Sequence, residues 1–119
     1  MVYKAEKTPA FMLCSNPVAA KSVDRLFILH NRYPMLLAEV HCFNNTEVAK
    51  VQYILNQAYS VGRLDHDKDI FLFTISWIEP TGAMMPRDVN DKVDPVLRRM
   101  ADWYKSYLIW EDSQPNEAP

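Results

Sequence analysis

Apolar and polar residues alternate with a period of two in two segments, which predicts two β-strands over 35–43 and 69–78. One side of each predicted strand is wholly apolar, with Leu36, Ala38, Val40 and Cys42 in the first and Phe71, Phe73, Ile75 and Trp77 in the second. The opposite sides carry the polar residues Glu39, His41, Thr74 and Ser76. A sheet buried on both faces would not place these residues inward, so we expect that side to face solvent or to line a groove.

Three segments have the apolar spacing of amphipathic helices, and one short strand is predicted over 10–15. The first helix is predicted over 17–31, after the capping residue Asn16. The alternative is a hairpin that pairs 26–30 with 35–43, because four consecutive apolar residues would also suit a buried strand. The second helix is predicted from Asn45 to Gly62, and the third from Asp94 and Pro95 to about Glu111. A polar loop is expected over 63–68 and a longer loop after Ile78.

The resulting order is strand, helix, strand, helix, strand, helix. Because the polar strand sides argue against a sheet covered on both faces, we expect an α+β fold. It is a two-layer sandwich of about three strands with helices on one face, in the order β-α-β-α-β-α. Residues 1–111 are expected to form a single globular domain, and residues 112–119, which lack apolar periodicity, a flexible C-terminal tail.

Composition narrows the classes of function that the chain suits. Its 119 residues carry a net charge of −2, which gives no positive surplus for binding nucleic acid or anionic lipid. No segment has the length of a membrane span or a signal-peptide core, so a cytoplasmic protein without membrane contact is expected. Only two glycines are present, too few for a phosphate-binding loop. Cys14 and Cys42 are isolated from one another, so we expect no metal site and no cofactor.

The aspartates of 65–69 match only the opening of a calcium loop. Ile70 stands where such a loop requires glycine, and Ser76 stands where it requires glutamate. A solvated turn is therefore the expected structure of this segment.

The last predicted helix has an apolar arc that is wider than one core-facing stripe needs. Val96, Trp103 and Trp110 lie along the edge of this arc. Tryptophans at such an edge are typical of protein interfaces, because they combine a large apolar area with a polar tip. The main hypothesis is a non-enzymatic interaction or accessory protein that uses these three residues to bind a protein partner or a second copy of itself as a homodimer.

The alternative hypothesis places function on the polar side of the sheet. Glu39 and His41 are two residues apart on a strand, so their side chains project from the same side. Thr74 and Ser76 would add hydroxyl groups from a neighbouring strand. Such a set could bind a small molecule or perform weak acid/base catalysis, although no catalytic residue is assigned.

Overall fold

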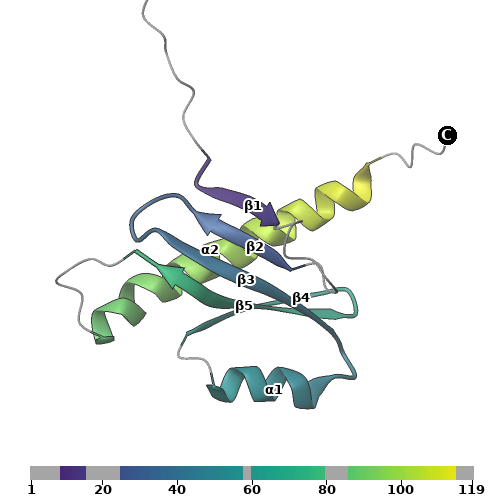
Figure 1. The fold of residues 1–119 in the computed structure, drawn as a ribbon. Coiled ribbons are helices and arrows are strands. Elements are labelled where there is room, and N and C mark those ends of the chain that lie inside the picture. Colours follow the sequence, from purple (N-terminus) through teal and green to yellow (C-terminus); the bar gives the residue numbers. More distant parts are fainter. Residues whose placement is uncertain (1–8, 16–24, 58–59, 80–85, 115–119) are drawn as a thin grey trace, which may run out of the picture.

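A computed structural model describes residues 9–15, 25–57, 60–79 and 86–114 of the chain. Five strands and two helices follow one another within these residues (Figure 1). They are β1 (Phe11–Ser15), β2 (Leu26–His30), β3 (Leu36–Asn44), α1 (Val48–Gln57), β4 (Val61–His66), β5 (Asp69–Ile78) and α2 (Pro86–Ser113). The α+β class is therefore shown. The predicted three-strand sandwich and its regular alternation of strands and helices are wrong.

The five strands form one antiparallel sheet in the order β1-β2-β3-β5-β4. The predicted strands over 10–15, 35–43 and 69–78 are confirmed as β1, β3 and β5. The predicted helix over 17–31 is wrong for the residues of this segment that the structure describes. Residues 26–30 form β2, which pairs with β3 as in the alternative hairpin. The rest of that predicted helix, up to residue 24, lies outside the described residues.

Strand β4 replaces most of the predicted polar loop over 63–68. Gly62 and Leu64 point inward and are buried, whereas Arg63 and Asp65 are exposed and form an ion pair of 2.9 Å. The alternation typical of a strand is therefore present, but one of its inward positions is a glycine. Gly62 does not end the second helix as expected, since α1 already ends at Gln57.

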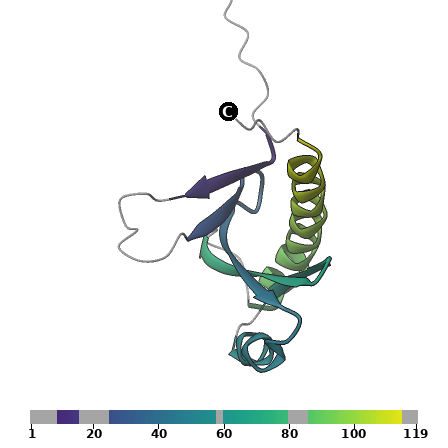
Figure 2. The same cartoon turned by 90° about the vertical axis from the view of Figure 1, so that its right-hand side faces the viewer.

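The two helices pack on opposite faces of the sheet. On one face, α2 contributes Val93, Leu97 and Met100 to a core that includes Phe71 and Phe73. On the other face, a smaller cluster joins Val51 of α1 to Ile70 and Leu72. Because neighbouring residues of β5 enter different clusters, the prediction that all helices cover one face is wrong. Figure 2 shows α2 beside the sheet and α1 at the far end from β1.

A β-bulge changes which side of the sheet the end of β5 presents. Ala38 pairs with Ile75 and Leu37 pairs with Trp77, so Ser76 has no partner residue in β3. The extra residue moves Trp77 away from the side of Phe73, where the alternation had placed it. Trp77 is 47% exposed as a result.

Helix α2 begins at Pro86, eight residues before the predicted start, and Pro95 lies inside it. Pro86 suits the first helical turn, where the missing backbone N–H has no partner to lose. The helix ends at Ser113 and so includes the first residues of the predicted tail. None of the described helices is both long and apolar enough to cross a membrane.

Candidate functional site

The apolar face of α2 becomes less buried from Val96 towards the end of the helix. Val96 is 1% exposed and belongs to the core, so it is not part of the surface. Trp103 is partly buried against the core, and Trp110 is 57% exposed. Figure 1 shows the last turns of α2 running past the tip of β1, which explains the loss of cover. Of the three residues predicted to bind a partner, the structure therefore leaves Trp110 widely accessible and Trp103 in part.

Four rings form a continuous row along this part of the molecule, which we call the aromatic row: Phe11, Trp103, Tyr107 and Trp110. The ring centroids of Phe11 and Trp103 are 5.8 Å apart. Trp103 stacks on Tyr107 at 6.2 Å, and Tyr107 meets Trp110 at 6.1 Å. Such contacts hold the rings in fixed positions, so the exposed end of the row is a preorganised apolar surface.

The start of the aromatic row lies on an edge strand. Among the described residues, β1 pairs with β2 on one side and has no strand on the other. Leu13 pairs with Ile28, a core residue on the α2 side, so Leu13 also points to that side, where it remains 36% exposed. An edge strand beside exposed apolar side chains is a surface that proteins usually cover. Neither Leu13 nor Tyr107 was identified from the sequence as a site residue.

The polar side of the sheet brings together three of the four residues predicted there. Glu39 and Thr74 pair directly across β3 and β5, and His41 Nε2 is 2.8 Å from the Thr74 hydroxyl. Ser76 is exposed at the bulge and is not part of this group. The sequence therefore predicted the shared side correctly but not the effect of the bulge.

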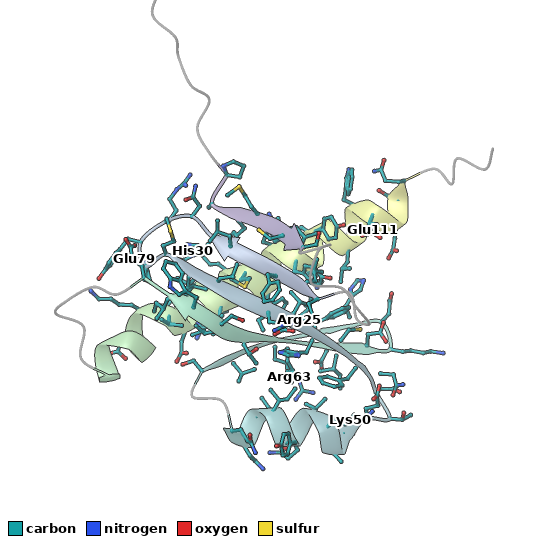
Figure 3. The ribbon with its side chains drawn as sticks, in the orientation of Figure 1. Arg25, His30, Lys50, Arg63, Glu79 and Glu111 are labelled. Atoms are coloured by element: carbon teal, nitrogen blue, oxygen red, sulfur yellow. The ribbon has the colours of Figure 1, made fainter. Side chains whose placement is uncertain are left out.

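Arg25 holds the Glu39 carboxylate. Figure 3 labels Arg25. Its guanidinium donates two hydrogen bonds, of 2.7 and 3.1 Å, to the two oxygens of Glu39. These bonds hold the pKa of Glu39 below its usual range. The arginine also lies over the Phe27 ring, 5.2 Å from its centroid. With both oxygens engaged by Arg25, Glu39 is a poor partner for a catalytic histidine. Arg25 was not predicted as a site residue, because it lies within the segment 17–31 that the sequence predicted to be a helix.

A pocket of about 410 Å³ lies where β3 extends past the start of β2, and it is lined by two further titratable groups, Cys42 and Tyr104. Burial raises the pKa of the Cys42 thiol above its ordinary value, and the nearby carboxylates of Asp69 and Glu47 act in the same direction. Burial also raises the pKa of Tyr104 to about 12. Both groups are held in the protonated form near neutral pH, so neither has the lowered pKa of an activated nucleophile.

A third group of side chains was not predicted from the sequence. His66, Asp67 and Asp112 come from the β4–β5 turn and the end of α2, and one ligand atom from each lies within 4.8 Å of the others. The first two residues were assigned to a solvated turn and the third to a flexible tail. Only the long α2 helix brings Asp112 to the turn.

No family model, no curated protein and no solved structure matches this chain. The function of the chain must therefore be inferred from its own geometry.

Proposed function

We propose that this protein is a non-enzymatic interaction protein whose partner is a second copy of the same chain. The observation that carries the proposal is the exposed end of the aromatic row beside the edge strand β1. Aromatic residues in a fixed arrangement are the side chains that most often dominate binding energy at protein interfaces. No activated nucleophile or free acid/base pair among the described residues competes with this interpretation.

A second copy suits this surface for three reasons. An edge strand can pair with its own symmetry mate, since a two-fold axis produces antiparallel pairing. The exposed side chains of Leu13 and Trp110 are apolar, so two copies of this surface can meet without burying an unpaired charge. A net charge of only −2 adds little long-range repulsion between copies.

The exposed area is sufficient for the centre of an interface but not for the whole. A tryptophan buries up to about 250 Å² when fully covered, so an exposed fraction of 57% in Trp110 leaves roughly 140 Å² available. A stable interface covers about 800 Å² on each partner. The remaining area must come from neighbouring groups, including Leu13 and the backbone of β1.

The test is the oligomeric state of the full chain, measured by sedimentation equilibrium across a range of concentrations. We expect a dimer for the natural sequence. Trp110→Gln should weaken self-association about thirtyfold or more, because loss of a central aromatic anchor commonly costs 2 kcal/mol or more. Trp77→Gln is the matched control: its indole is similarly exposed but lies elsewhere, so the dimer should be unchanged.

Circular dichroism of each variant shows whether the fold is kept. Trp110 is mostly exposed, so its replacement should leave the free energy of unfolding of the monomer nearly unchanged. Trp103 is a less clean site, because it packs on both Phe11 and Tyr107 and its loss would also weaken the core. A natural chain that stays monomeric at all concentrations would overturn the proposal. Equal dimerisation of the natural chain and Trp110→Gln would also overturn it.

A further inference from the structure

The β4–β5 turn and the last turn of α2 place one histidine and two aspartates together. His66 ends β4, Asp67 follows it in the turn, and Asp112 lies near the end of α2. Asp67 has a φ of 55°, in the left-handed region that aspartate tolerates better than most residues. The three residues belong neither to the aromatic row nor to the group around Glu39.

The Nε2 atom of His66 is shielded from solvent and has no hydrogen-bond partner. A carboxylate oxygen of Asp67 lies 3.6 Å away, which is beyond normal hydrogen-bond length. Leaving a shielded polar atom without a partner is unfavourable, and such atoms are uncommon in folded proteins. A group that accepts the nitrogen lone pair would remove this cost, and a metal cation is such a group.

We propose that His66, Asp67 and Asp112 bind a divalent transition-metal ion of the zinc class. An imidazole nitrogen suits zinc and its neighbours in the first transition row, whereas calcium and magnesium prefer oxygen ligands alone. Two carboxylates and a neutral imidazole balance the charge of a divalent cation. Three protein ligands leave a fourth position for water in a tetrahedral site.

The present spacing is close to what zinc requires. With bonds of about 2.0–2.1 Å, the ligand atoms of a tetrahedral site lie roughly 3.3 Å apart. The three ligand atoms lie within 4.8 Å of one another, so a shift of about 1.5 Å at most would close the site. Asp67 and Asp112 are exposed, so their side chains can rotate inward without displacing core residues.

A bound ion would attach the end of α2 to the β4–β5 turn. The last turn of a helix frays readily, because its carbonyl groups lack partners within the helix. Coordination of Asp112 would oppose this fraying and stabilise the folded chain by mass action. Trp110 is two residues from Asp112, so its fluorescence offers a local signal for binding.

Zinc chloride titrated into the metal-free full chain tests the proposal, with binding followed by calorimetry and tryptophan fluorescence. We expect one zinc ion per chain. His66→Gln and Asp112→Asn should each weaken binding about tenfold or more. Asp112→Asn is the safer variant for folding, because Asp112 is exposed on the helix surface.

Matched controls separate this site from other zinc ligands in the chain. His41→Gln and Asp102→Asn remove the same side-chain types elsewhere, and each should leave zinc affinity unchanged. Cys42→Ser should also leave it unchanged. The proposal is overturned if zinc does not bind at millimolar concentration, if the two site variants bind as tightly as the natural chain, or if binding is lost with Cys42→Ser instead.

Discussion

Gly62 lies where β4 packs closely against α2, so Gly62→Ala is a direct test of this packing. A Cβ atom built at Gly62 would lie 3.2 Å from Leu97 Cβ, 3.3 Å from the Leu97 carbonyl oxygen and 3.3 Å from Phe73 Cβ. Favourable contacts between carbon atoms lie at about 3.5–4.0 Å, so the helix or the strand must move by a few tenths of an ångström. All three neighbours are backbone or Cβ atoms, which cannot turn away as the end of a flexible side chain can.

The expected effect combines two opposing contributions. Overpacking of a close contact costs about 1–3 kcal/mol. Replacing glycine by alanine also restricts the unfolded chain, which stabilises the folded state by about 0.4–1 kcal/mol when the backbone conformation is allowed. Gly62 does not have a positive φ, so alanine adds no backbone strain. We therefore expect the free energy of unfolding to fall by about 1–2 kcal/mol.

Urea unfolding followed by circular dichroism measures this change. Gly62→Val should cost more than Gly62→Ala, because a larger side chain enters the same space. An alanine variant as stable as the natural chain, or more stable, would show that α2 does not approach β4 as closely as the structure indicates.

Three further predictions concern the core and its titratable groups. Phe73→Ala should lower the free energy of unfolding by about 3–5 kcal/mol in urea titrations, because Phe73 is fully buried under α2. Burial raises the pKa of Tyr104 from 10.0 to about 12, so the folded state holds the phenol proton more tightly than the unfolded chain does. The free energy of unfolding should therefore fall as pH rises through this range, and Tyr104→Phe should reduce that pH dependence. Arg25→Gln should raise the pKa of Glu39, which can be measured by NMR titration of the carboxyl carbon. The stabilisation that the Arg25–Glu39 pair provides is present at neutral pH and is lost as pH falls through the lowered pKa of Glu39.

The parts of the fold that the sequence predicted correctly are those with strong local periodicity. Strands β3 and β5 each have an apolar side in the sequence, and this pattern determined their position and, apart from Trp77 beyond the bulge, the side of β5 that faces α2. Strand β4 was not predicted because one of its inward positions is Gly62. Glycine has no apolar side chain, so the segment does not show a clear alternation of apolar and polar residues. Strand β2 was ambiguous because four consecutive apolar residues suit either a helix or a strand, and only pairing with β3 decides between them.

The candidate sites could be predicted only in part, because each depends on distant contacts. The common side of Glu39, His41 and Thr74 follows from strand alternation, but the arginine that binds Glu39 does not. Val96, Trp103 and Trp110 lie along the same edge of one helix, yet their burial differs because α2 crosses the sheet and then runs past it. Periodicity gives the direction of a side chain around its helix, whereas tertiary packing decides whether another layer covers it.

The length of α2 accounts for both proposed sites. Its 28 residues span about 42 Å at 1.5 Å per residue, whereas the ten residues of β5, the longest strand described, span about 34 Å at 3.4 Å per residue. The excess leaves the end of the helix without sheet beneath it. Trp110 and Asp112 are two residues apart and therefore point about 200° apart around the helix axis. A metal ion at Asp112 and a second copy at Trp110 thus occupy different sides of the same helix end, so failure of either proposal leaves the other intact.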